Sequence, residues 1–287
     1  MAKTVFSSSP PAVTDVLVSF PVPHVLLVTL NRPGQLNALR RAQHAALDRL
    51  FHWYDAEPSL RCAVITGTGR AFCAGADLKE WNERNAEKEA AMSTESSSSP
   101  STASWAGSGF GGLSNRAGKK PVVAAVNGLC LGGGMEMAVN CDLVVAAASA
   151  RFGLPEVARG VVAIAGALPR IVRTLGRQRA AEMALTGRAF SAAEMGRWGL
   201  VNRVVSEAAD VVPVALELAQ AVAANSPDAV IVSREGLRLG WESVGPQLGT
   251  ELLERGLYGQ IDRASNMREG LLSFVEKRAP VWTDSKL

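Results

Sequence analysis

Two glutamates lie where the sequence predicts that helices begin. Glu136 follows three consecutive glycines in "GLCLGGGMEMAVNCD", residues 128–142, and Glu156 follows a proline in "RFGLPEVARG", residues 151–160. Glutamate side chains act as general acids and bases when their surroundings shift the pKa toward the working pH. Methionines flank Glu136, and a buried unpaired carboxylate is costly unless it is protonated or hydrogen-bonded. These residue types favour proton transfer.

A structural interpretation of the same glutamates needs no chemistry. A negative charge in the first turn of a helix is favourable, because the helix dipole places partial positive charge there. The proline before Glu156 also suits the first position of a helix. Taken alone, each glutamate fits this structural role better than a catalytic one.

Small residues beside predicted helix starts offer backbone N–H groups to a ligand. Besides the glycines of residues 132–134, the segment "RAFCAGADLKEW", residues 70–81, joins an apolar run to a helix start through small residues. A peptide N–H reaches a ligand atom only where no bulky side chain blocks it, and helix starts leave N–H groups without partners. Two convergent N–H groups would form an oxyanion hole, in which one donor contributes about 2.7–4 kcal/mol to the transition state.

The surrounding pattern predicts an α/β core that positions these segments. "VLVSF" and "VLLVTL" indicate a hairpin, and apolar spacing predicts a helix over residues 37–57. "RCAVITG", "PVVAAVNG" and "DLVVAAA" then indicate buried strands that alternate with helices. We expect this core to span residues 1–207.

Two regions depart from this alternation. Residues 82–119 are rich in Ser and Gly, as in "STESSSSPSTASWAGSGFGG", which predicts a mobile insertion. Residues 208–287 show helical periodicity only. Because their broad apolar faces need a surface to pack on, we expect a helical region that mediates oligomerisation.

Composition excludes several classes of function. The 287 residues are 47% hydrophobic and 20% charged, as in ordinary soluble domains. The 30 Lys and Arg residues barely exceed the 27 Asp and Glu residues, and they are scattered, so no nucleic-acid partner is expected. No apolar run is long enough to span a membrane. The four cysteines lack metal-ligand spacing and the three histidines all precede residue 53, so no metal is expected.

The last three residues are Ser285, Lys286 and Leu287. This tripeptide is the address read by the peroxisomal import receptor. The sequence therefore predicts a peroxisomal location and a transient partner that binds this end of the chain.

The combination of "AFCAGADLKE", "PVVAAVNGLCLGGGMEMAVNCD" and "FGLPE" resembles the crotonase superfamily, specifically its enoyl-CoA hydratase branch. The resemblance extends from "NRPGQLNAL" to "EGLLSFVEKRAP" and covers nearly the whole chain. It implies an α/β crotonase fold, which is a spiral core of repeated β-β-α units with a helical C-terminal region. It also implies a homotrimer or a dimer of trimers.

The resemblance assigns roles to individual residues. It implies that the N–H groups of Ala76 and Gly133 hold the thioester oxygen of an acyl-CoA, and that Glu136 and Glu156 flank the substrate. No separate cofactor is implied, because coenzyme A is part of the substrate. Further matching positions line the path of the CoA and acyl groups, or reach the CoA of a neighbouring subunit: Ala74, Asp77, Leu78 and Lys79 for the first role, and Phe274 and Lys277 for the second.

The implied reaction is the reversible addition of water to a trans-2-enoyl-CoA, giving a 3-hydroxyacyl-CoA in peroxisomal fatty-acid β-oxidation. Two alternatives share the fold and the oxyanion hole, namely Δ3,Δ2-enoyl-CoA isomerisation and a specialised acyl-CoA dehydration. A third alternative is a non-catalytic acyl-CoA-binding protein. The acyl pocket departs from the family, because "GVVAIAGALPRIVR" keeps only Gly166 of a Pro and Gly cluster, and Trp105 or Phe110 are candidates for its wall.

Overall fold

The computed structural model describes residues 6–83, 86, 107–242, 244–261 and 264–287. Its main sheet has six strands in the order β1-β2-β3-β5-β7-β10. The first two strands form the predicted antiparallel hairpin, and each of the other neighbouring pairs is parallel. The strands of this sheet are β1 Val16–Ser19, β2 Val25–Leu30, β3 Cys62–Gly67, β5 Val122–Val126, β7 Leu143–Ala147 and β10 Arg203–Val205.

A second sheet has four strands in the order β4-β6-β8-β9. The strands β4, β6 and β8 are parallel, and β9 pairs with β8 antiparallel. Its strands are β4 Ala71–Cys73, β6 Leu129–Leu131, β8 Arg151–Gly153 and β9 Phe190–Ser191.

The two sheets alternate along the chain. Strands β3, β5 and β7 of the main sheet are each followed directly by β4, β6 and β8 of the second sheet. A helical segment follows each of β4, β6 and β8, so the chain repeats one β-β-α unit that contributes a strand to each sheet. The three segments whose small residues or glutamates were singled out therefore leave neighbouring parallel strands of the second sheet at the same edge.

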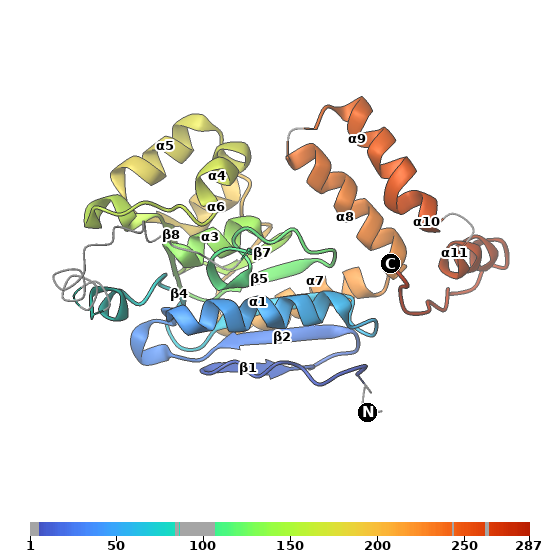
Figure 1. Cartoon of the computed structure of the whole chain (residues 1–287), viewed down its shortest axis with the longest axis horizontal. Coiled ribbons are helices and arrows are strands. Elements are labelled where there is room, and N and C mark those ends of the chain that lie inside the picture. The colour runs from blue at the N-terminus through green and yellow to red at the C-terminus, as the bar shows by residue number, and fades with distance from the viewer. Residues whose placement is uncertain (1–5, 84–85, 87–106, 243, 262–263) are drawn as a thin grey trace, which may run out of the picture.

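Helices cover the core and extend from it (Figure 1). Helix α7, the first α-helix of the predicted C-terminal region over residues 208–287, packs against β2, β3, β5 and β7, whereas α8 to α11 project from the sheets. The α-helices are α1 Arg41–Ala56, α3 Gly133–Asn140, α4 Ala167–Leu175, α5 Arg177–Thr186, α6 Ala192–Arg197, α7 Val211–Ala223, α8 Pro227–Trp241, α9 Pro246–Leu253, α10 Gly259–Ile261 and α11 Ser265–Val275. How the chain divides into domains at residues 207 and 208 stays a prediction.

The helix predicted over residues 37–57 begins later, at Arg41. Leu36 and Asn37 adopt left-handed φ angles of 52° and 56°, which no α-helix tolerates. The Asn37 side chain accepts a hydrogen bond from Arg32 N–H and donates one to the carbonyl of Ala71. This buried turn, which spacing alone does not reveal, ties the start of the helix to β4.

The predicted mobile insertion over residues 82–119 is wrong for its last part. Residues 84–85 and 87–106, which include Trp105, lie outside the described residues. Phe110 and Leu113 are buried in the core, and the short 3-10 helix η2 Phe110–Gly112 packs against α1 and α3. Apolar burial has overridden the Ser and Gly composition there.

Among the described residues, no helix is long and apolar enough to cross a membrane.

Candidate active site

Three segments approach one another at the edge of the second sheet. A Cβ placed on Gly75 would lie 3.2 Å from the backbone nitrogen of Gly133, and Gly75 itself has a φ of 97°. Only glycine fits such a close backbone approach at this φ. The segment that carries Ala76 and the start of α3 are therefore in direct contact.

The local backbone hydrogen bonds around Ala76 and Gly133 do not use the two predicted oxyanion-hole N–H groups. Ala76 forms an isolated parallel bridge with Leu39 that uses the Gly75 carbonyl and the Asp77 N–H. The Ala76 N–H accordingly points away from this bridge. Gly133 is the first residue of α3, and the N–H groups of a first helical turn have no acceptor within the helix. The role of both N–H groups remains a prediction.

Each of the three consecutive glycines has its own steric reason. Gly132 has a φ of 56°, and a Cβ there would lie 3.2 Å from Oε1 of Glu156. A Cβ on Gly133 would lie 2.5 Å from the Phe110 ring, and one on Gly134 would lie 2.2 Å from the Cys73 carbonyl oxygen. The stretch thus lets the start of α3 press against a carboxylate, a ring and a strand at once.

Glu136 is buried in the first turn of α3, with 4% of its surface exposed. The N–H of Ala167 donates a hydrogen bond of 3.1 Å to its Oε2. Burial raises the pKa of Glu136 to about 7, and the negative charge of Glu156 adds to this rise, while hydrogen bonds from Ala167 and Ala165 oppose it. A carboxyl group with this pKa exchanges protons near neutral pH.

Glu156 lies on η3 Pro155–Arg159, a short 3-10 helix that follows β8. Its Oε1 faces Gly132, and its Oε2 is a buried oxygen atom with no hydrogen-bond partner among the described residues. Burial raises the pKa of Glu156, and a hydrogen bond from its own N–H opposes the rise. An unsatisfied buried carboxylate oxygen marks a place where a polar ligand or water would be stabilised.

The two glutamates are a coupled pair without a counter-ion. Within the described part of the chain, neither carboxylate belongs to a salt bridge, although Arg170 lowers the pKa of Glu136 weakly from a distance. The negative charge of Glu156 adds to the raised pKa of Glu136, and burial raises the pKa of Glu156, so both groups hold a proton more readily than an exposed glutamate does. Such a pair can donate a proton and accept another in one reaction.

Four predicted residues on the segment after β4 have different surroundings. The Asp77 carboxylate accepts a 3.0 Å hydrogen bond from Arg32 and one from the N–H of Glu80, so it caps the following helical turn. Burial raises the pKa of Asp77, but these hydrogen bonds bring it below the usual value. Ala74 is part of the same loop, and Leu78 and Lys79 are exposed. The structure thus gives Asp77 a structural partner, and a role for any of the four in CoA binding stays a prediction.

Phe274 and Lys277 are not near the glutamates within one chain. Helix α11 and the turn after it lie apart from α3 in Figure 1, and 85% of the Phe274 surface is exposed. Their predicted contact with the CoA of a neighbouring subunit requires an oligomer and stays a prediction.

The contacts that support the site were not predictable from the sequence. Phe110, named only as a candidate for the acyl-pocket wall, packs its ring on Gly133. Ser114, Ala165 and Ala167 were not singled out, yet the N–H of Ala167 donates a hydrogen bond to Glu136. These contacts join segments far apart in the sequence, so no local signal was available for them.

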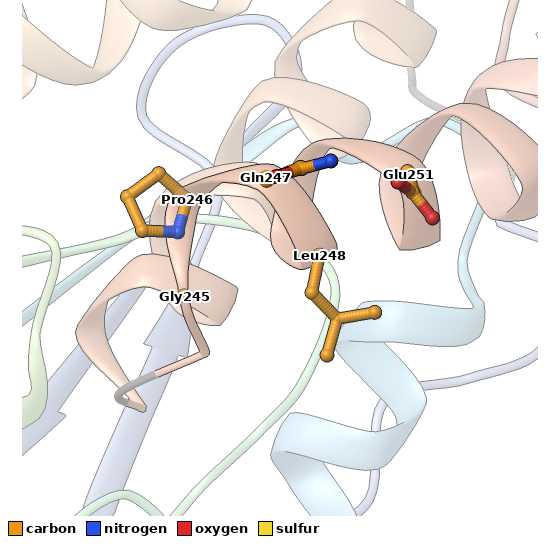
Figure 2. A pocket seen from close by; sticks show the side chains of 5 residues that line it. All are labelled: Gly245, Pro246, Gln247, Leu248 and Glu251. Carbon is orange, nitrogen blue, oxygen red and sulfur yellow. The ribbon is translucent and has the colours of Figure 1, made fainter.

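Neither the cysteines nor the surface pocket of the described structure offers a second site of this kind. Among the described residues, no group of three His, Cys, Asp or Glu side chains is arranged to hold a metal ion, and all four cysteines are free thiols. A surface pocket near the start of α9 is lined by one ionisable side chain, Glu251 (Figure 2). The residues that line it are Gly245, Pro246, Gln247, Leu248 and Glu251.

Known proteins share both the sequence and this architecture. Residues 23–285 match the family model described as enoyl-CoA hydratase/isomerase. An enoyl-CoA hydratase structure from Mycobacterium marinum superposes with a TM-score of 0.82 at 32% identity, covering 94% of this chain and 99% of that one. This similarity confirms the predicted crotonase fold.

Two fungal relatives match over almost their full length. This chain is 60% identical to a mevalonyl-coenzyme A hydratase of Beauveria bassiana, covering 98% of this chain and 99% of the relative. It is 51% identical to a mevalonyl-coenzyme A hydratase of Aspergillus fumigatus, covering 96% and 98%. The chain therefore belongs to the enoyl-CoA hydratase/isomerase family of the crotonase superfamily, and it is a hydro-lyase.

Proposed function

We propose that the chain interconverts mevalonyl-CoA and the corresponding 2-enoyl-CoA by removing or adding water. Two glutamates without a counter-ion among the described residues, Glu136 buried and Glu156 half-buried, carry the proposal of water chemistry. The choice of acyl group is supported by the names of the two relatives that are more than half identical to this chain. For that reason we place this substrate ahead of a straight-chain intermediate of fatty-acid β-oxidation.

The chemistry of the acyl group fits the two carboxyl groups. A mevalonyl thioester carries a hydroxyl and a methyl group on its β-carbon and a second hydroxyl at its far end. In the dehydration direction, one carboxylate removes a proton from the α-carbon, and the electron pair moves onto the thioester oxygen. The N–H groups of Ala76 and Gly133 stabilise this oxyanion.

The second half of the reaction releases water. The enolate electrons form the double bond between the α- and β-carbons as the bond from the β-carbon to its hydroxyl breaks. The other carboxyl group protonates that hydroxyl, so the leaving group is water. Hydration is the reverse sequence, and the division of the two proton transfers between Glu136 and Glu156 is left open.

The test is turnover of defined thioesters by the purified protein. We expect mevalonyl-CoA to gain the absorbance of a conjugated thioester, with kcat/KM at least about tenfold above that for crotonyl-CoA hydration, since a site built around a second hydroxyl discriminates against its absence. Turnover of a 3-enoyl-CoA to its 2-isomer without water addition would favour the isomerase alternative. Folded protein that binds CoA yet turns over none of these thioesters would contradict the proposal and favour a binding protein.

We further propose that the chain forms a homotrimer or a dimer of trimers. Large apolar side chains are exposed on the C-terminal helices, among them Leu237, Leu248, Leu271, Phe274 and Val275. An exposed apolar surface of this kind supports burial against another subunit. Sedimentation velocity would test this, and a monomer at micromolar concentration would contradict it.

The peroxisomal location remains a proposal that rests on Ser285, Lys286 and Leu287. Deleting these residues should move a fusion with an amino-terminal fluorescent label from peroxisomes to the cytosol, while kinetics stay unchanged. An unaltered punctate distribution in cells without the native protein would count against the signal.

A further inference from the structure

A buried hydroxyl connects two supports of the active site. Ser114 is fully buried, and its Oγ accepts a 2.6 Å hydrogen bond from the N–H of Phe110. The same Oγ donates a 2.6 Å hydrogen bond to the carbonyl of Ala165. One side chain thus joins η2 to the chain segment immediately before α4.

The first support positions the oxyanion hole. The Phe110 ring fills the space into which a Cβ of Gly133 would project. His44 of α1 holds the same short helix from its other side, because its Nδ1 accepts a 3.0 Å hydrogen bond from Gly111 N–H and its ring lies 4.5 Å from the Phe110 ring. The position of η2 therefore determines where the ring supports Gly133 and its N–H.

The second support positions a catalytic carboxylate. Ala165, whose carbonyl accepts the hydrogen bond from Ser114, belongs to the segment of residues 165–167. In this segment the N–H of Ala167 donates a 3.1 Å hydrogen bond to Glu136 Oε2. The Ala165 backbone also contributes a hydrogen bond to Glu136. A shift of this segment would change both the orientation and the hydrogen bonding of the carboxylate.

Two glycines, Gly109 and Gly166, pack so closely against Ser114 that neither position has room for a side chain. A Cβ on Gly109 would lie 2.4 Å from Ser114 Oγ, and a Cβ on Gly166 would lie 2.5 Å from the Ser114 carbonyl oxygen. Both glycines have positive φ angles, of 76° and 132°. Glycine at both positions lets the backbone close around Ser114, whose hydroxyl satisfies a donor and an acceptor that are both buried.

We propose that Ser114 is a positioning residue that holds the oxyanion-hole glycine Gly133 and the carboxylate of Glu136 in their mutual geometry. It does not touch the substrate and acts through Phe110 on one side and Ala165 on the other. This inference rests on the proposed function for its effect on turnover, but its effect on the carboxylate of Glu136 can be measured without any substrate.

The test compares Ser114→Ala with a matched control, Thr66→Val. The Thr66 hydroxyl is also buried and donates a 2.8 Å hydrogen bond to a carbonyl, that of Ala125, but it lies within the main sheet. Carbon-13 NMR of labelled glutamate carboxyl groups gives the pKa of Glu136, and the signal that is lost in Glu136→Gln assigns it. Other charges that act on this group, those of Glu156 and Arg170, stay in place in both variants.

We expect Ser114→Ala to raise the pKa of Glu136, because the N–H groups of Ala165 and Ala167 favour the ionised form and would move away. Its kcat for mevalonyl-CoA should fall roughly 10–10²-fold with a smaller change in KM, the cost of a misplaced reacting group. Thr66→Val should change neither quantity. A folded Ser114→Ala protein with the wild-type pKa and kcat would overturn the inference.

A measurement on the wild-type protein covers the case in which Ser114→Ala does not fold. Native-state hydrogen exchange reports the free energy of the opening that exposes each amide. The Phe110 and Ala167 amides should exchange through one shared opening with equal protection, because Ser114 joins their segments. Independent exchange of the two amides, with clearly different denaturant dependence, would overturn the inference. If the wild type turns over no thioester, the proposed function fails, and the pKa and exchange results still decide the role of Ser114.

Discussion

Two groups of buried and half-buried charged residues in this molecule differ in whether they form ion pairs. At the end of α1, Arg116 contacts the Asp55 carboxylate at 2.5 Å, and Lys120 donates from its N–H to Asp55 and from Nζ to the Tyr54 carbonyl. At the start of α3, the negative charge of Glu156 acts on Glu136, and neither carboxylate is in a salt bridge among the described residues. The first group is compensated and the second is not.

The contrast distinguishes buried charges that stabilise the fold from buried charges that take part in proton transfer. Compensated charges in a core hold segments together as long as every partner remains, because removal of one partner leaves an uncompensated buried charge. Uncompensated carboxylates are destabilising and persist where their protons are used. The raised pKa of Glu136, at about 7, places its titration where a small change in environment changes its charge.

The largest effect is expected when a glutamate of the second group is replaced by its uncharged amide. Glu136→Gln and Glu156→Gln should each reduce turnover of mevalonyl-CoA by roughly 10²–10⁴-fold, because an amide cannot transfer the proton. CoA binding and folding should be retained. Steady-state kinetics with active-site titration would measure this, and a variant that keeps near-wild-type turnover would make that glutamate a helix-start anion only.

The oxyanion-hole half of the site is tested by Gly133→Ala. A Cβ at this position meets the Phe110 ring at 2.5 Å. The methyl group should displace the start of α3 and its N–H, lowering kcat roughly 10²–10³-fold.

Gly34→Ala is the matched control, since a Cβ at that position meets no atom within 4 Å. Its kcat should equal that of the wild type. If Gly133→Ala folds and also equals the wild type, the glycine stretch serves packing and the oxyanion hole lies elsewhere.

Local signals predicted much of this arrangement and missed its long-range part. The hairpin, the buried strands and the glutamates at helix starts were predictable because each signal lies within a few neighbouring residues. The start of α1 was misplaced because the side chain of Asn37 bonds to Ala71 in a different unit of the fold. Phe110 was assigned to a mobile stretch because its partners, His44 and Gly133, are distant in sequence.

The cost of the uncompensated pair predicts a pH dependence of stability. The folded pKa of Glu136 is about 7, against an ordinary value of 4.5, so the folded state takes up the proton more strongly than the unfolded state does. Its contribution to stability is full below the ordinary pKa and is lost as pH rises through the folded pKa. By this linkage Glu136→Gln should gain up to about 3 kcal/mol over the wild type between about pH 4.5 and pH 8.

Urea unfolding of both proteins at these two pH values measures the difference. A constant difference in the free energy of unfolding at both pH values would contradict the raised pKa of Glu136.

The compensated group should show the opposite pattern, with a loss of stability and little change in rate. Lys120→Met removes the Nζ that donates to the carbonyls of Tyr54 and Glu57 at the end of α1. Leaving these buried acceptors without a donor should cost roughly 1–3 kcal/mol of unfolding free energy. The kcat per folded molecule should be unchanged, and a large loss of kcat in a folded variant would show that the two groups are coupled.

The central claim is that this pair of carboxyl groups moves water to and from the β-carbon of a CoA thioester. The most direct measurement is mass spectrometry of mevalonyl-CoA incubated with the protein in water enriched in oxygen-18. The account predicts that the wild type places oxygen-18 in the hydroxyl on the β-carbon, and that Glu136→Gln and Glu156→Gln do so far more slowly. Recovery of unlabelled mevalonyl-CoA from the wild type, after the enoyl-CoA has formed and been rehydrated, would contradict it, as would equal labelling by all three proteins.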